Sequence, residues 1–162
     1  MTTPDRSDGG AAERRREPRA GAGEPDNDAL ERRAEEFRRF LVSVVGPAFL
    51  ELRETFRDGG RDVEIIPYTD QAAPAEATIA VSYQGNPEFA FSVGARIDPE
   101  RAVVMKRRLV AVPGMSPQIR VEEAPLLQSA ERASDARSIS RADVVASVRT
   151  DYWLLRRTTR AR

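Results

Sequence analysis

One stretch decides the fold of this chain: AEATIAVSYQGNPEFAFSVGARI, residues 75–97. Apolar and polar side chains alternate with a period of two in each half of the stretch, and the turn-forming residues Gly85, Asn86 and Pro87 lie between the halves. Such alternation predicts two β-strands, each with one apolar and one polar face. We therefore expect a β-hairpin that packs one dry face on a core and turns a wet face to solvent.

The register of this hairpin follows from matching apolar residues across the pair, because a slip of one residue turns every side chain to the wrong face. This matching places Tyr83 opposite Phe89 and Val81 opposite Phe91. The connection then runs over residues 84–88. A three-residue loop is excluded, since Pro87 cannot adopt the positive φ that its last position needs, so we expect a wider loop or a bulge.

The rest of the sheet is predicted from weaker signals. Asp98-Pro99-Glu100 is typical of a type I turn, after which a third hairpin strand returns over residues 102–112. A short strand over residues 62–68 and another over 118–122 bring the antiparallel sheet to four or five strands. Residues 125–137 have helical composition with a weak apolar face, which predicts a short helix.

The third strand has two possible registers against the hairpin. Pairing Ile97 with Val103 keeps the apolar residues together on the dry face, whereas the neighbouring register turns Lys106 and Arg108 inward. We favour the first register for that reason. It leaves Arg107 on the dry side, where its charge must reach an edge, a carboxylate or a cleft.

A long amphipathic helix is predicted ahead of the sheet. Asp28 and Glu31 resemble a capping box, and apolar residues then recur at steps of three and four to about Asp58. A glycine-proline pair interrupts the helix, and since proline lacks a backbone donor, either a kink or a restart of the helix is expected near residues 43–47. Gly59-Gly60 then ends the helix.

Three large residues lie off the main apolar stripe of this helix: Phe40, Phe49 and Leu50. The helix is therefore apolar over more than one face and must be covered from two directions. One explanation is burial between the sheet and a second helix, and the other is a dimer interface.

A last helix is predicted from Ser140 onward. Ser140 suits the cap position, Asp143 lies in the first turn, and an apolar stripe runs from Val144 to Leu155. We expect this stripe to dock on the core.

Composition excludes many functions. The chain of 162 residues has no cysteine and no histidine, which removes thiolate and imidazole metal sites, disulfides, cysteine nucleophiles and serine triads. Its formal net charge is zero with 32% charged residues, so no global field attracts nucleic acid or membrane. No run of about 20 apolar residues could span a bilayer, and no leader segment is recognisable. We predict a cytoplasmic protein without a membrane partner.

The domain organisation is predicted to be one tail and one domain. Residues 1–27 offer almost nothing apolar to bury, so ordering them would cost entropy without compensation, and we expect a disordered tail. Residues 28–162 are expected to form a single α+β domain. Its architecture is a kinked N-terminal helix, an antiparallel sheet of four or five strands, and a C-terminal helix packed on one sheet face.

Neither a phosphate-binding loop nor a dinucleotide fingerprint is present, because neither glycine pair lies between a strand and a helix. Nothing in the sequence brings together the carboxylates that a metal nuclease or a glycosidase needs. We therefore expect no catalytic residue, no metal and no cofactor, and a protein that binds rather than catalyses.

Two functions remain. The first is a small protein-interaction or adaptor domain whose partner is another protein or a second copy of itself. Its interface candidates are Phe40, Phe49, Leu50 and Trp153. The alternative is a nucleic-acid-binding protein that uses basic residues on the third hairpin strand and near the C-terminus. Its candidates are Lys106, Arg107, Arg108, Arg156, Arg157, Arg160 and Arg162.

Overall fold

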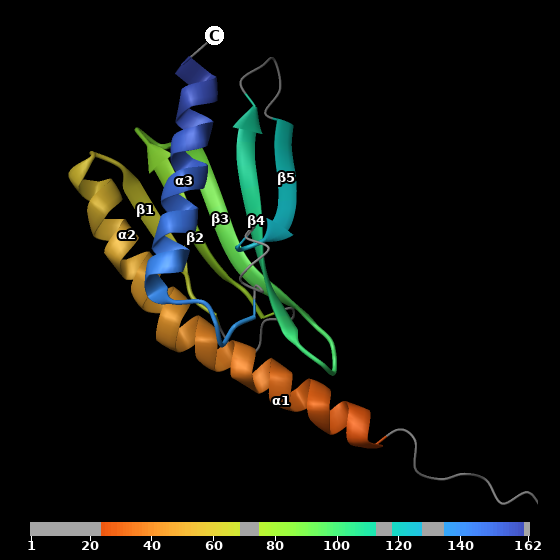
Figure 1. Cartoon of the computed structure of the whole chain (residues 1–162). Coiled ribbons are helices and arrows are strands. Elements are labelled where there is room, and N and C mark those ends of the chain that lie inside the picture. The colour runs from red at the N-terminus through yellow and green to blue at the C-terminus, as the bar shows by residue number, and fades with distance from the viewer. Residues whose placement is uncertain (1–23, 69–74, 113–117, 128–134, 161–162) are drawn as a thin grey trace, which may run out of the picture.

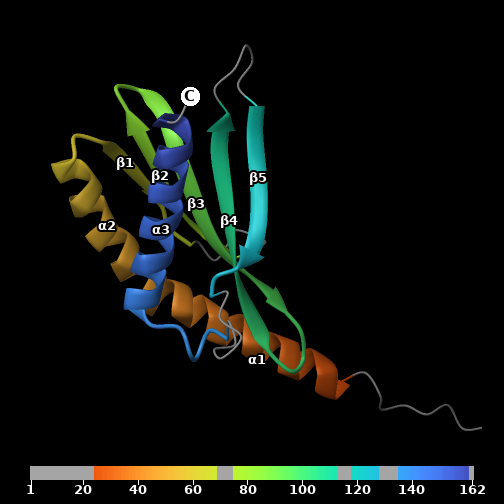
Figure 2. The same cartoon turned by 45° about the horizontal axis from the view of Figure 1, so that its top comes forward.

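The computed structural model describes residues 24–68, 75–112, 118–127 and 135–160. A layer of helices lies on one face of a five-stranded antiparallel sheet (Figures 1 and 2). In chain order the elements are α1 (Glu24–Phe40), the π-helical turn η1 (Leu41–Val45), α2 (Gly46–Asp58), β1 (Asp62–Ile66), β2 (Ala77–Tyr83), β3 (Asn86–Ile97), β4 (Ala102–Val112), β5 (Gln118–Pro125) and α3 (Arg141–Arg160). The predicted α+β architecture is confirmed.

The sheet is a simple meander in which each strand pairs with the next, in the order β1-β2-β3-β4-β5. We call the side that faces α2 and α3 the covered face. It carries Val63, Ile65, Ala77, Ile79, Val81, Phe89, Phe91, Val93, Val104, Lys106 and Arg108. We call the other side the open face, because no described helix lies on it. It carries Asp62, Glu64, Ile66, Thr78, Ala80, Ser82, Ala90, Ser92, Met105 and Arg107.

The N-terminal helix changes direction where the kink was predicted (Figure 1). The cause is the π turn η1, in which the Gly46 amide donates to the carbonyl of Leu41, five residues earlier. Pro47 follows directly and has no amide hydrogen, so the regular hydrogen-bond ladder is lost at this point in any case. The beginning of the helix was predicted wrongly. It lies at Glu24, four residues before Asp28, with Pro25 in the first turn where proline is tolerated.

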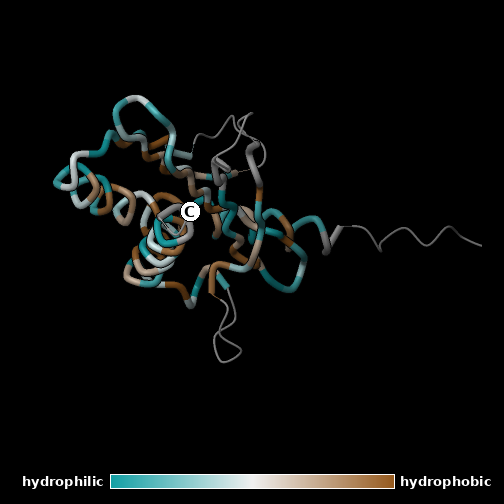
Figure 3. The backbone as a smooth tube through the Cα atoms, turned by 90° about the horizontal axis from the view of Figure 1, so that it is seen from above, coloured by the Kyte–Doolittle hydropathy of each residue, from teal (hydrophilic) through white to brown (hydrophobic). Residues whose placement is uncertain are grey.

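The core lies between the helix layer and the covered face. Figure 3 shows hydrophobic residues gathered between the two layers. Its largest fully buried side chains come from the three α-helices, the π turn and the central strands: Phe37, Leu41, Val45, Phe49, Leu52, Ile79, Val81, Phe91, Val93, Val104, Val144 and Val148. Burying one such side chain stabilises the fold by about 1.5 to 3 kcal/mol. The period-two pattern of the hairpin therefore supplies buried side chains to the sheet side of the core.

The central hairpin forms, but its register differs from the predicted one. Val81 pairs with Phe89, Ile79 with Phe91 and Tyr83 with Asn86. The turn is a tight one on Gln84 and Gly85, which adopt φ of 51° and 77°, so the predicted loop over residues 84–88 is wrong. The expected bulge is present between Val81 and Ser82, and it returns the apolar side chains to the covered face.

The register of β4 is the neighbouring one, which the sequence argued against. Ile97 pairs with Ala102, and Lys106 and Arg108 lie on the covered face. The prediction was wrong because it assumed that no counterion for those charges lies across the core, whereas Asp151 on α3 pairs with both of them. Arg107 accordingly lies on the open face, where its guanidinium donates to Glu76 at 3.2 Å.

The remaining elements agree in part with their predictions. Asp98 accepts the amides of Glu100 and Arg101, as its turn signal predicts. Strand β1 ends at Ile66, two residues early, and β5 continues to Pro125. The predicted helix over residues 125–137 falls mostly on residues outside the described ranges.

The cap of α3 is confirmed. The Asp143 amide donates to Ser140 Oγ at 3.2 Å, and the Ser140 amide donates to the Asp143 carboxylate at 2.9 Å. Residues 1–23, which make up most of the predicted tail, lie outside the described residues, and residues 24–27 belong to α1. No helix within the described part of the chain has the length and apolar character that crossing a membrane requires.

Candidate functional site

A charge network joins β4 and β5 to α3 on the covered face. Lys106 Nζ donates to Asp151 Oδ2 at 2.8 Å, and Arg108 Nη1 donates to Asp151 Oδ1 at 3.1 Å. Glu122 on β5 accepts a further hydrogen bond from Arg108, so two carboxylates balance two cations. Asp151 is only 4% exposed and Lys106 7%. Because a buried charge without a partner is costly, we interpret this network as the device that fixes α3 on the sheet.

A second polar cluster lies at the β2–β3 bulge. Glu88 accepts a hydrogen bond from the Tyr152 hydroxyl at 3.0 Å and another from Arg61 Nε at 3.4 Å. The guanidinium of Arg61 also lies 5.3 Å from the ring centre of Tyr83. Burial raises the pKa of the Tyr152 hydroxyl, and its hydrogen bond to Glu88 raises that pKa further. Tyr152 therefore remains a hydrogen-bond donor at neutral pH, and the cluster ties the end of α3 to the bulge.

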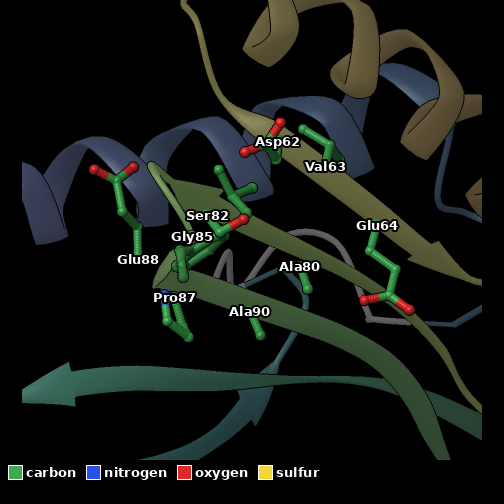
Figure 4. Close-up of a pocket in the computed structure, with 11 residues that line it drawn as sticks. Asp62, Val63, Glu64, Ala80, Ser82, Gly85, Pro87, Glu88 and Ala90 are labelled. Atoms are coloured by element: carbon green, nitrogen blue, oxygen red, sulfur yellow. The ribbon is translucent and has the colours of Figure 1, made fainter.

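The open face carries a hollow of about 520 Å³ over strands β1 to β3 (Figure 4). We call it the β1–β3 hollow. Its open-face lining is Asp62, Glu64, Ala80, Ser82 and Ala90, and the turn and bulge residues Gly85, Pro87 and Glu88 also line it. The remaining lining residues, Val63, Val81 and Phe89, belong to the same strands but have their side chains on the covered face. Ala80 and Ala90 are direct partners across the β2–β3 pair. Two methyl groups fill little space above a sheet, so the surface is depressed there, between the longer residues Glu64 and Pro87.

The charges of the open face divide into paired and unpaired ones. Away from the hollow, Arg107 bonds Glu76 at 3.2 Å and Arg96 lies 3.5 Å from Glu123. At the hollow, Asp62 and Glu64 are exposed and have neither a hydrogen-bond nor an ion-pair partner in the described ranges of the chain. The β1 side of the hollow is therefore a local excess of negative charge.

This excess does not amount to a metal site. Within the described residues, no group of three or more acidic side chains comes together in a way that could hold an ion. Asp62 and Glu64 alone supply two carboxylates, whereas hard cations such as Ca²⁺ take about six to eight oxygen ligands. The hollow is better suited to an organic group than to a bare ion.

Two of the four predicted interface residues belong to the core. Phe40 and Phe49 are 4% and 0% exposed, so neither is available to a partner. Burial and a dimer interface were the two explanations for these off-stripe residues, and burial holds for Phe40 and Phe49. The extra residue in the π turn shifts the apolar face, so Phe49 enters the core one turn after Val45. Leu50 and Trp153 are 49% and 56% exposed and stay interface candidates.

The three basic candidates on β4 are divided between the two faces of the sheet. Lys106 and Arg108 are balanced inside the molecule, and Arg107 lies on the opposite face of the sheet. Arg156 lies 5.9 Å from the ring centre of Tyr152, and Arg157 is exposed. The side chain of Arg160 and the whole of Arg162 lie outside what the structure describes.

Sequence reasoning missed Asp151, Glu88 and the hollow. A signal for Asp151 was present: it lies three residues after Val148 and four before Leu155, on the apolar stripe of α3. A carboxylate on such a stripe indicates a buried partner cation. The hollow had no such signal, because it depends on which residues of β2 and β3 stand side by side.

No family model, curated protein or solved structure matches this chain significantly.

Proposed function

We propose that this protein is a small non-enzymatic interaction domain, an adaptor that binds another protein on the open face of its sheet. The observation that carries the proposal is the β1–β3 hollow, a depression with an apolar floor and polar rim on a face that no described helix covers. Hollows of about 300 to 1,000 Å³ with few polar groups are typical binding sites.

Binding is favoured over catalysis by the chemistry of the lining. Ser82 offers a hydroxyl, but the chain contains no histidine to act as its base. The carboxylate of Glu88 is occupied by Tyr152 and Arg61. What remains is suited to recognition: small side chains, one hydroxyl and two exposed carboxylates.

A second copy of the chain is the alternative partner, and it would use the helix layer. Leu50 on α2 and Trp153 on α3 are large apolar side chains with half their surface exposed. The nucleic-acid alternative has less support, because Lys106 and Arg108 are already neutralised by Asp151 and Glu122.

The test compares which proteins are retained by the immobilised full chain and by two variants. Ala90→Leu fills the hollow, and Trp153→Ala removes the exposed anchor of the helix layer. A partner retained by the wild type and by Trp153→Ala, but lost from Ala90→Leu, supports the proposal. Loss from Trp153→Ala alone would move the interface to the helices. Mass measurement in solution, with thermal unfolding as the check on folding, identifies a homodimer.

A further inference from the structure

We infer that the β1–β3 hollow takes an arginine or lysine side chain from an extended segment of the partner. This inference rests on the proposed function and names the chemistry of what binds there. It follows from the charge of the rim, the shape and apolar character of the floor, and the number of ligands on offer.

The rim supplies the charge complementarity. Asp62 and Glu64 are two positions apart on β1, so both point to the open face, about 7 Å apart along the strand. Glu76 and Glu123 on this face form ion pairs with arginines, whereas Asp62 and Glu64 have no partner in the described ranges. Even the neighbouring Arg61 is directed to Glu88 and Tyr83 instead.

The floor supplies a surface for the stem of the side chain. Arginine and lysine carry three or four methylene groups that pack along apolar surface while the charged head stays near water. Ala80 and Ala90 offer such a surface beside Glu64, as Figure 4 shows. The volume of about 520 Å³ exceeds one side chain, so part of the partner's backbone fits as well.

An extended segment is favoured because the two carboxylates follow the period of a strand. In an extended chain, alternate side chains point the same way at the same spacing as Asp62 and Glu64. A segment with cations at alternate positions therefore meets both carboxylates at once. Helical partners present their side chains at steps of three and four and do not match this spacing.

The experiment measures the binding of fluorescein-labelled ten-residue peptides to the full chain by anisotropy. One peptide has arginine at alternate positions with threonine between, and the comparison peptide has glutamine in place of each arginine. We expect the arginine peptide to bind, more weakly as salt rises, and the glutamine peptide not to bind. The variant Asp62→Asn/Glu64→Gln should weaken binding about tenfold, which is what losing two partly screened ion pairs amounts to.

A matched variant controls for net charge. Asp28→Asn/Glu31→Gln removes one aspartate and one glutamate charge from exposed positions on α1, and it should bind the arginine peptide within about twofold of the wild type. Equal weakening in both double variants would show unspecific attraction and overturn the inference. No binding of the arginine peptide, or equal binding of the glutamine peptide, would also overturn it.

Different outcomes would overturn this inference and the proposed function. If a partner protein is lost from Ala90→Leu but binds Asp62→Asn/Glu64→Gln as tightly as the wild type, the hollow binds a partner without reading its charge. The inference is then wrong and the interaction domain stands. If the hollow-filling variant changes no binding at all, both are wrong.

Discussion

On the covered face of the sheet, Lys106 and Arg108 meet Asp151 at 2.8 and 3.1 Å, whereas on the open face Asp62 and Glu64 meet no cation in the described ranges. The difference follows from solvent. A charge in the core must find a partner from the same chain, because water cannot supply one, while an exposed carboxylate is satisfied by water until a partner arrives. Buried charge here fixes the fold, whereas the exposed carboxylates of β1 form no such contacts in the described ranges, and we propose that they serve binding.

The largest expected effect concerns the buried charges of the covered face. Asp151→Ala should destabilise the protein by about 3 to 5 kcal/mol, because it leaves Lys106 buried without a counterion. Chemical denaturation followed by circular dichroism measures it. Asp62→Ala is the matched change on the open face and should cost less than about 0.5 kcal/mol. Equal costs would mean that the two faces do not differ in how they hold charge.

The same comparison explains how far the fold was predictable. Alternation in the hairpin and the periodicity of the helices are local, so the α+β class, the hairpin and the Ser140 cap were predicted correctly. The register of β4 is not local. It depends on Asp151, which lies 45 residues after Lys106 in sequence, and a rule that keeps every charge out of the core selects the wrong register.

The candidate site was less predictable, for two physical reasons. The π turn at η1 adds a residue to one turn, so a stripe counted at a fixed helical period left Phe49 off the main apolar face, whereas Phe49 is fully buried in the structure. The hollow arises from Ala80 and Ala90 on neighbouring strands, and the predicted hairpin register did not pair them. Trp153 and Leu50 are exposed, and their role as interface residues stays a prediction.

The next effect concerns the middle of the open face, which is drier than its alternation suggests. Ser92 is 3% exposed, and its hydroxyl lies 2.7 Å from that of Thr78. Ser92→Ala should therefore cost about 1 kcal/mol in urea denaturation, because Thr78 loses its partner. Ser82→Ala, on the same face and without such a bond in the described residues, should stay within about 0.5 kcal/mol. A cost below about 0.5 kcal/mol at both serines would show that the whole open face is solvated.

A smaller effect depends on pH. The pKa of Tyr152 is raised above the ordinary tyrosine value of 10.0, by burial first and by the hydrogen bond to Glu88 second. Its contribution to stability is therefore fully present below pH 10, the unfolded value, and is lost as the pH rises through the folded pKa. Denaturation midpoints measured from pH 8 to 11 should fall for the wild type and fall less for Tyr152→Phe. Parallel curves would mean that Tyr152 does not titrate differently in the two states.

The smallest expected effect concerns Arg157, an exposed cation of the helix layer. Arg157→Glu should change stability by less than about 0.5 kcal/mol, since the side chain is exposed and makes no ion pair with the residues that the structure describes. It should also leave affinity for generic single- and double-stranded DNA unchanged, because Asp151 already neutralises Lys106 and Arg108, so these two residues do not form a basic surface with Arg157. Gel-shift titrations at two salt concentrations measure this. Micromolar, salt-sensitive binding by the wild type that disappears in Arg157→Glu would mean that exposed cations, and not the exposed carboxylates of β1, carry the function of this protein.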